Sequence, residues 1–477
     1  MYTKNDLNFF IDGAWSPSST DITLDVVDPS TEKSFAKIAL GGSADVDRAM
    51  KAARAAFETF AFSTKEERVA LLERICVEYE KRAEDLAQAI TRELGCPISF
   101  SRDEQVAVGV AHLNATIKVL RDMSFDEVRG TSLIAKEPIG VCALITPWNW
   151  PMNQIVCKVA PALAAGCTVV LKPSEIAPMS GIIFAEIMDA AGTPPGVFNL
   201  INGTGPDAGQ LMAEHPEADM VSFTGSTRAG VAVAKAAADT VKRVAQELGG
   251  KSANIILDDA DLESSVTMGV QSCFSNSGQS CDAPTRMYVP RAQYERALEI
   301  AKQAAASLKV GEPSDTSNDL GPVISQVQFD KIQSYISIAQ DEGAVLVTGG
   351  PGRPDGMQTG FYVKPTVFGG VAPDMTISRD EIFGPVLAIL PYETDEEVIA
   401  LANDSVYGLA AYIQAGDIPR ARRMARKLRA GSVYINYPDH DPMAPFGGYK
   451  QSGNGREYAD WGIHDFLEIK GIVGWRA

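Results

Sequence analysis

The chain has few histidines and no paired cysteine motif. It contains 4 histidines and 7 cysteines in 477 residues, without any Cys-x-x-Cys pair. The cysteines are Cys76, Cys96, Cys142, Cys157, Cys167, Cys273 and Cys281. Their odd number and wide scatter argue against a disulfide framework or a structural zinc site, and we expect no bound metal. Because no histidine lies near a candidate nucleophile in sequence, we expect a carboxylate to act as any catalytic base.

Long apolar runs are also missing, as are the basic and apolar regions of a signal peptide at the start of the sequence. We therefore expect a cytoplasmic protein with no membrane partner. The 43 basic residues against 61 acidic ones give a net charge of −18, which repels phosphate polymers and makes nucleic acid an unexpected partner. With 45% hydrophobic and 22% charged residues, the chain can form more than one core, and we expect two or three domains.

Short β-branched runs alternate with helical stretches in the middle of the chain. The first set of expected strands covers residues 141–145, 169–171, 197–200 and 220–223. This alternation is typical of βαβ units and predicts an α/β fold with a parallel sheet. Between the first two runs, Pro151 can begin a helix and Gly166 can end it. A second alternation, with strands near 285–289, 344–348 and 386–389 and a helix near 294–308, predicts a second α/β domain.

One cysteine stands in a polar loop, Gly278-Gln279-Ser280-Cys281. A reactive thiol needs access and neighbours that stabilise charge, although an inert packed cysteine fits this spacing about equally well. Two other segments favour the reactive interpretation. Glu247-Leu248-Gly249-Gly250-Lys251 offers a carboxylate, and Pro147-Trp148-Asn149 offers a carboxamide. The three segments together predict a nucleophile, a base and an oxyanion donor.

Through these motifs and four others the chain resembles the NAD(P)-dependent aldehyde dehydrogenase superfamily. The resemblance runs from about residue 10 to residue 472 in the family's order and spacing. The other motifs are Lys172-Pro173-Ser174-Glu175, Phe223-Thr224-Gly225-Ser226, Glu381-Ile382-Phe383-Gly384-Pro385 and Pro445-Phe446-Gly447-Gly448-Tyr449-Lys450. The resemblance implies a Rossmann-like NAD-binding domain at 1–118 and 139–249 and a catalytic domain at 250–457. It also implies a small β oligomerisation arm at 119–138 and 458–477, with a strand near 131–137, and hence a homodimer or homotetramer.

The resemblance also implies a reaction, the NAD-dependent oxidation of an aldehyde to the carboxylic acid. Cys281 would form a thiohemiacetal and then a thioester, which water activated by Glu247 would hydrolyse. Asn149 and the backbone N–H of Cys281 would form the oxyanion hole. Lys158 and Glu457 match a proton-relay pair of the family, and a partly buried ion pair is their alternative interpretation.

The expected cofactor site lacks the Gly-x-Gly-x-x-Gly fingerprint, which agrees with the family's variant of the Rossmann fold. A turn at 225–230 leads from a strand into a helix and suits a phosphate. The carboxylate of Glu175 would accept a 2′-hydroxyl and repel a 2′-phosphate, so we expect NAD over NADP, although Lys172 and Ser174 could tolerate NADP. The cofactor candidates are Ile145, Thr146, Pro147, Trp148, Lys172, Ser174, Glu175, Gly205, Phe223, Gly225, Ser226, Leu248, Gly249, Glu381 and Phe383.

The substrate is a small-molecule aldehyde that the sequence does not specify further. The resemblance places its entrance beside Trp150, Asn153, Gln154, Cys157, Ser280, Asp282, Tyr437 and Phe446. A CoA-acylating semialdehyde dehydrogenase is an alternative, which Glu247 disfavours because that subgroup generally lacks this base. A catalytically silent structural protein on the same fold is another, which intact Cys281 and Asn149 disfavour.

Overall fold

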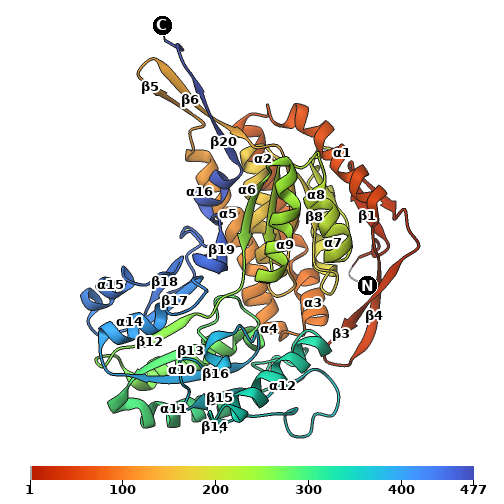
Figure 1. Ribbon diagram of the computed structural model, residues 1–477. Helices are drawn as coiled ribbons and strands as arrows, with labels where there is room; N and C mark the ends of the chain where they lie inside the picture. Colours follow the sequence, from red (N-terminus) through yellow and green to blue (C-terminus); the bar gives the residue numbers. More distant parts are fainter. Residues whose placement is uncertain (1–2, 477) are drawn as a thin grey trace.

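The computed structural model describes residues 3–476 as two large sheets covered by helices, with a narrow arm that projects from one end (Figure 1). The first sheet has eight strands in the order β19-β11-β10-β7-β8-β9-β1-β2. Its strands are β1 (Asn8–Ile11), β2 (Ala14–Pro17), β7 (Val141–Ile145), β8 (Thr168–Lys172), β9 (Phe198–Leu200), β10 (Met220–Thr224), β11 (Arg243–Glu247) and β19 (Gly453–Asn454).

The four runs predicted as strands between 141 and 223 form the centre of this sheet. Strands β7, β8, β9 and β10 pair in parallel, as the alternation predicts, and all their residues are buried. Continuous burial on both faces explains why they are apolar throughout. Helix α6 (Pro151–Ala165) starts at Pro151 and ends before Gly166, whose φ of 99° is favourable only for glycine. Toward the two edges, β1 pairs antiparallel with β9 and β19 antiparallel with β11, which the alternation did not predict.

Helices cover both faces of the first sheet (Figure 1). They are α1 (Ser43–Phe60), α2 (Lys65–Lys81), α3 (Ala83–Leu94), α5 (Ala107–Asp122), α6, α7 (Met179–Ala190), α8 (Gln210–Glu214) and α9 (Thr227–Ala237). Helix α6 is buried along its whole length, so it forms the centre of the largest hydrophobic core. None of the described helices is long and apolar enough to cross a membrane.

The second sheet has seven strands in the order β14-β15-β16-β13-β12-β17-β18 and confirms a second α/β unit. Its strands are β12 (Ala253–Ile256), β13 (Arg286–Pro290), β14 (Val345–Thr348), β15 (Thr366–Gly369), β16 (Val386–Tyr392), β17 (Ala410–Gln414) and β18 (Ser432–Ile435). Its helices are α10 (Leu262–Phe274), α11 (Tyr294–Ser307), α12 (Gln326–Asp341), α13 (Thr376–Arg379), α14 (Asp395–Asn403) and α15 (Ile418–Ala425). A separate hairpin pairs β3 (Thr23–Asp28) with β4 (Lys33–Ala39).

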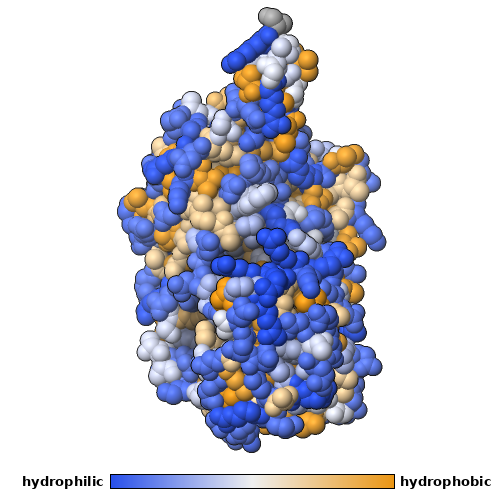
Figure 2. Space-filling model, turned by 90° about the vertical axis from the view of Figure 1, so that its left-hand side faces the viewer, coloured by the Kyte–Doolittle hydropathy of each residue, from blue (hydrophilic) through white to orange (hydrophobic). Residues whose placement is uncertain are grey.

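The arm is a three-stranded antiparallel sheet in the order β20-β6-β5. It combines β5 (Asp126–Arg129) and β6 (Ser132–Pro138) with β20 (Leu467–Ile472), from the far end of the chain. Helix α16 (Ala459–Asp465) leads into β20. Figure 2 shows hydrophobic residues on the arm, where Ile469 is 73% exposed and Val473 85% exposed. The arm therefore presents apolar side chains that its own subunit does not cover.

Candidate active site

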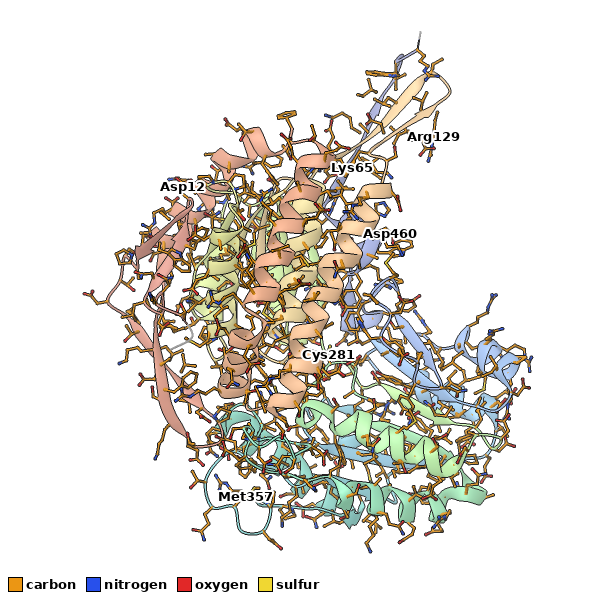
Figure 3. All side chains as sticks on the ribbon, turned by 180° about the vertical axis from the view of Figure 1, so that it is seen from behind. Asp12, Lys65, Arg129, Cys281, Met357 and Asp460 are labelled. Carbon is orange, nitrogen blue, oxygen red and sulfur yellow. The ribbon has the colours of Figure 1, made fainter. Side chains whose placement is uncertain are left out.

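Cys281 lies where the two bodies of the molecule meet (Figure 3). A cavity of about 140 Å³ opens beside it. The cavity is lined by Pro147, Trp148, Asn149, Thr224, Gly225, Ser226, Glu247, Leu248, Gly249, Cys281, Gln328, Lys331, Glu381 and Phe383. The ends of β10 and β11, the turn after β7 and the loops of the second sheet thus converge on one space. The predicted nucleophile Cys281, the predicted base Glu247 and the amide of Asn149 all line this cavity.

The loop before Cys281 has an unusual backbone. Asn276 and Ser277 have φ values of 53° and 54°, and Gly278 has a φ of 73°. A Cβ on Gly278 would lie 2.2 Å from the carbonyl carbon of Gly384, so only glycine fits there. Gln279 anchors the loop, because its Oε1 accepts a hydrogen bond from the Ile324 N–H at 3.0 Å. The strain is therefore held by packing and hydrogen bonds next to the candidate nucleophile.

The Cys281 thiol is partly exposed, whereas the other cysteines are buried. Burial raises the pKa of this thiol well above its ordinary value, and the carboxylates of Asp282, Glu381 and Glu247 raise it further. The sequence motif led us to expect neighbours that favour the thiolate. The described residues favour the thiol instead, so Cys281 needs a base before it can attack a carbonyl.

Asn149 is held as a donor beside Cys281. The side-chain Nδ2 of Asn149 donates to the backbone carbonyl of Gln279 at 3.0 Å. The backbone carbonyl of Asn149 accepts hydrogen bonds from Gln105 Nε2 at 3.0 Å and from Asn276 Nδ2 at 2.9 Å. The Asn149 amide nitrogen has a second proton that none of these bonds uses. This proton is available for an oxyanion in the cavity.

Glu247 ends β11 and is only 4% exposed. Both of its carboxylate oxygens are buried without a hydrogen-bond partner. Burial raises its pKa well above the ordinary value, and Glu457 raises it further, against the smaller effects of Lys158 and Arg456. Gly447 makes room for it, since a Cβ at that position would lie 2.7 Å from Glu247 Oε1. An unpartnered, desolvated carboxylate is poised to take up a proton.

Behind Glu247, Lys158 and Glu457 form a buried ion pair. Lys158 also donates to Ser222 Oγ at 3.1 Å, and the Cys157 thiol donates to Glu457 Oε2 at 3.2 Å. Burial lowers the pKa of Lys158, but Glu457, Cys157 and Glu247 together outweigh this effect and the net pKa is raised. The pair thus keeps its charges inside the protein. Cys157, a substrate candidate, is part of this network.

The cofactor candidates fall into two groups. Eight of them line the cavity together with Asn149: Pro147, Trp148, Gly225, Ser226, Leu248, Gly249, Glu381 and Phe383. Trp148 and Phe383 meet edge to face at 5.3 Å, and Glu381 Oε1 accepts the Gly250 N–H at 3.0 Å. Ser226 Oγ accepts the Ala229 N–H at 3.3 Å and caps α9, so the free N–H groups of that helix point toward the cavity side.

The second group lies at the ends of the neighbouring strands and does not line the cavity. Ile145 on β7 and Lys172 on β8 lie opposite each other in the sheet. Both side chains approach Gly209, since a Cβ added to this glycine would lie 3.9 Å from Ile145 and 3.7 Å from Lys172. The Lys172 ammonium donates to the carbonyls of Pro173 and Gly203, each at 2.8 Å, and pairs with Glu175 at 3.3 Å. The remaining members are Thr146, Ser174, Gly205 and Phe223, of which all but Gly205 are buried.

The substrate candidates also occupy separate clusters. Trp150 Nε1 donates to Ser280 Oγ at 2.8 Å. The Tyr412 hydroxyl donates to the Asp282 carbonyl at 3.2 Å, and the Tyr412 ring lies 5.7 Å from that of Tyr437. Gln154, also a candidate, lies on the buried helix α6. Phe446 stacks on Tyr458 at 5.3 Å.

Asn153 is fixed by two side chains that sequence analysis did not identify. Its Oδ1 faces His112 Nε2 at 2.6 Å and accepts from the Tyr458 hydroxyl at 3.3 Å. Burial lowers the pKa of His112 to about 4, so the ring is neutral near pH 7 and its Nε2 carries the proton for this bond. Both contacts use the amide oxygen. The Asn153 Nδ2 group keeps its two protons for another acceptor.

Thr224, Gln328 and Lys331 line the cavity but were missed in the sequence. Gln328 and Lys331 lie on α12, far from any motif, and only the folded chain brings them to the site. Thr224 lies between Phe223 and Gly225 in a recognised motif, so its position in the sequence could have identified it as a cavity residue. The Oγ1 of Thr224 and the Oε1 of Gln328 are buried without partners. A polar ligand with a flat ring fits these unused groups and the Trp148–Phe383 pair.

A parallel sheet, a helix N-terminus at its carboxyl edge and a cysteine opposite a buried glutamate are typical of dinucleotide-dependent oxidoreductases with a cysteine nucleophile. The aldehyde dehydrogenase family model matches residues 15–472. The chain belongs to the aldehyde dehydrogenase family.

Several relatives are similar over almost the whole chain. A 3-succinoylsemialdehyde-pyridine dehydrogenase of a Pseudomonas species is 50% identical over 98% of both chains. Aldehyde dehydrogenase C of Pseudomonas syringae, solved as a cysteine-to-alanine variant with NAD+ and octanal, is 52% identical with a TM-score of 0.98 over 99% of this chain and 97% of that one. A betaine aldehyde dehydrogenase of Staphylococcus aureus, solved with NAD+, is 37% identical with a TM-score of 0.96 over 99% and 97%.

Proposed function

We propose that the protein oxidises an aldehyde to the carboxylic acid with NAD and releases the product by hydrolysis. The observation that carries this proposal is the pairing of Cys281 with Glu247 in one cavity. Glu247 has no structural partner to explain its burial. A desolvated base opposite a protonated thiol can serve both nucleophile activation and water activation.

The chemistry follows from these groups. Glu247 takes the Cys281 proton, and the sulfur bonds to the aldehyde carbon while the carbonyl oxygen becomes an oxyanion. The free Nδ2 proton of Asn149 and the Cys281 N–H stabilise that oxyanion. When bound, NAD accepts the hydride that this carbon loses, which leaves a thioester on Cys281. Glu247, after it has released the first proton, removes one from water, and the hydroxide adds to the thioester carbon and displaces the sulfur. Glu247 returns this proton to the Cys281 sulfur as the acid departs.

Lys158 and Glu457 act behind the base. The charge of Glu457 raises the pKa of Glu247, and that of Lys158 lowers it, so the pair adjusts the proton affinity of Glu247. Within this pair, the carboxylate of Glu457 is the group that can accept a proton. We infer that protons leave Glu247 through this pair during each turnover.

NAD fits the two groups of cofactor candidates. The α9 N-terminus at Gly225 and Ser226 suits its phosphates, and the cavity wall at Leu248, Gly249, Glu381 and Phe383 suits the nicotinamide riboside. Lys172, Ser174 and Glu175 suit the other ribose, with Ile145, Thr146, Pro147, Trp148, Gly205 and Phe223 around them. The partial exposure of Glu175 keeps its charge available against a 2′-phosphate. Relatives solved with NAD+ support this assignment.

The substrate carries an oxygen along its chain. The Asn153 amide is clamped through its oxygen, so the two protons on its nitrogen are free to donate to a substrate oxygen. One relative is named for a substrate with a ketone beside a pyridine ring, and another was solved with octanal, which has no second oxygen. The clamped donor favours a substrate with a second oxygen, which can accept one of the Asn153 Nδ2 protons.

We also infer an oligomer, either a homodimer or a homotetramer. Residues 119–138 and 458–477 would form the interface arm, 1–118 and 139–249 the NAD-binding domain, and 250–457 the catalytic domain. The support is the exposed Ile469 on β20 and the exposed Val473 directly after this strand. Deleting the residues after Trp461 should give a monomer or insoluble protein. A stable intact monomer at micromolar concentration in light scattering would contradict the assembly.

The decisive test is NADH production from a panel of aldehydes, with and without CoA. We expect NADH and free acid without CoA, and higher kcat/KM for a 4-oxo aldehyde than for an alkanal of equal length. Dependence on CoA would instead establish the acylating alternative. An absence of turnover with every aldehyde, despite NAD binding, would establish the silent alternative.

A further inference from the structure

A second cavity lies on the opposite side of the Gly249-Gly250 turn from the reacting groups. Its volume is about 20 Å³, and its walls come from the start of β12, from β13 and from the segments before β17 and after α15. Lys251 and Arg286 supply its charged lining, together with Arg429. None of the groups assigned to aldehyde oxidation above lines this cavity.

Lys251 has no partner for its charge. Its side chain is 2% exposed, and its ammonium nitrogen makes no hydrogen bond to any described residue. An ammonium has three protons to donate, and burying them unused is expensive. Lys251 therefore needs a partner that the protein chain does not provide.

Arg286 adds a second buried cation. Its guanidinium donates to the carbonyls of Lys251, Leu401 and Ala402 and to the Tyr288 hydroxyl. All four acceptors are neutral, so no carboxylate balances this charge. A guanidinium has five N–H donors, and one of them is left after these bonds.

The surrounding charges do not neutralise the two cations. Lys450, whose pKa burial lowers, also feels the repulsion of Arg429 and Arg286. The nearby carboxylate of Asp404 pairs with Arg379 at 2.7 Å. On the other side, Glu381 is bonded to the Gly250 N–H. The cavity is thus a positively charged space within the described residues.

We propose that this cavity binds a small monovalent inorganic anion of about the size of chloride. Its volume holds roughly one or two water-sized spheres, which excludes phosphate and organic acids. The anion accepts the Lys251 protons and the remaining Arg286 proton. It thereby removes the repulsion between two cations directly beneath the turn that positions Gly249 at the active site.

The site gives a distinct dependence on pH. Burial and the repulsion of Arg286 lower the pKa of Lys251 to about 7, against the opposing effects of Cys273 on α10 and of the carboxylates of Glu381 and Asp380. The anion binds the protonated lysine. Its affinity is therefore greatest below pH 7 and falls as Lys251 loses its proton at higher pH.

The test uses the full chain in sodium bromide or chloride, against sodium gluconate of equal ionic strength, because gluconate is too large for the cavity. We expect the halides to raise the unfolding midpoint by roughly 1–3 °C at pH 6 and by less at pH 9. Lys251→Met should abolish the difference between halide and gluconate. Lys302→Met, on the exposed side of α11, should keep it.

Crystals of the unaltered protein soaked in bromide give a measurement that does not depend on any variant folding. An anomalous peak between Lys251 and Arg286 is expected. Equal midpoints in halide and gluconate, or a map with no bromide at this position, would show that the cavity holds water only and would overturn the proposal.

Discussion

Each side of the active-site cleft contains a buried lysine, and the two lysines have opposite surroundings. Lys158, on α6 of the first sheet, forms an ion pair with Glu457, and its net pKa is raised. Lys251, just before β12 of the second sheet, has no partner, and its pKa is lowered to about 7. Burial opposes the charge of both lysines, so the partner decides the outcome. The charge behind Glu247 is therefore fixed, whereas the charge beneath the Gly249-Gly250 turn depends on pH and on a bound anion.

The largest effect is expected from removing the reactive group on the second-sheet side. Cys281→Ala should reduce aldehyde oxidation by roughly 10³-fold or more, because no other described cysteine lines the cavity. NAD binding, followed by fluorescence, should persist. Cys273→Ala is the matched control: that thiol is buried on α10, and its loss should leave turnover near normal. Turnover retained in Cys281→Ala would place the nucleophile elsewhere.

The reactive group on the first-sheet side should affect a different step. Glu247→Gln should lower the steady-state rate by about 10²–10⁴-fold, because thioester hydrolysis becomes limiting. One burst of NADH should remain, but it should be slower than in the unaltered enzyme because Cys281 has lost the base that takes its proton. In the unaltered enzyme the rate should rise with pH as Glu247 ionises. Because the pKa of Glu247 is raised, this rise should occur at a higher pH than an ordinary carboxylate would give. Stopped-flow absorbance and a pH profile measure both. A burst of unchanged speed would show that another group activates Cys281, and an unchanged steady-state rate would leave Glu247 no catalytic role.

The two lysines themselves provide the direct test of the comparison. Lys158→Met should cost about 3–5 kcal/mol of unfolding free energy, because it leaves Glu457 buried without its counter-ion. Lys251→Met should stabilise the protein in halide-free buffer. A folded pKa below the unfolded value penalises folding fully below about pH 7, and the penalty disappears as pH approaches the unfolded pKa. Urea unfolding at pH 6 and pH 9 measures these free energies, and the gain in Lys251→Met should be larger at pH 6. Equal losses of unfolding free energy in Lys158→Met and Lys251→Met would refute the contrast between the two lysines.

The smallest effect concerns cofactor choice. Glu175→Gln should narrow the preference for NAD over NADP by roughly two- to fivefold, because an exposed charge interacts weakly through water. The ratio of kcat/KM for the two cofactors measures it, with Glu186→Gln, on α7, as a control for general charge loss. Equal efficiency with both cofactors in the unaltered enzyme would contradict the role of Glu175.

The central fold was predictable because its strands are continuous apolar runs between helix signals. Residues 141–145 are β7 exactly as predicted, and the predicted runs near 169, 198 and 220 are β8, β9 and β10. Strand β11 and the edge strand β19 were not predicted. Strand β19 has only two residues, and its pairing depends on a chain segment more than 200 residues from β11 in sequence. Local pattern carries no information about such pairings.

The residues of the site also divide into those that the sequence predicted and those that only the structure revealed. Cys281, Glu247 and Asn149 were identified because each lies in a recognisable motif, and the fold brings them to one cavity. His112 and Tyr458, which clamp Asn153, lie in no motif and meet only through packing. Lys251 lies inside a recognised motif, but its lack of a partner depends on the residues around it in space. Sequence therefore predicted which groups can react, and the structure was needed to show what holds them.

The protonation state of Cys281 also affects the chemical lifetime of the protein. Peroxides and alkylating reagents attack thiolates far faster than thiols, and burial with three nearby carboxylates keeps this sulfur protonated. A molecule waiting without cofactor or substrate is thus shielded from oxidants, although its nucleophile is the one cysteine that solvent reaches among the described residues. Inactivation by iodoacetamide should be slow in the resting enzyme and accelerate only at alkaline pH.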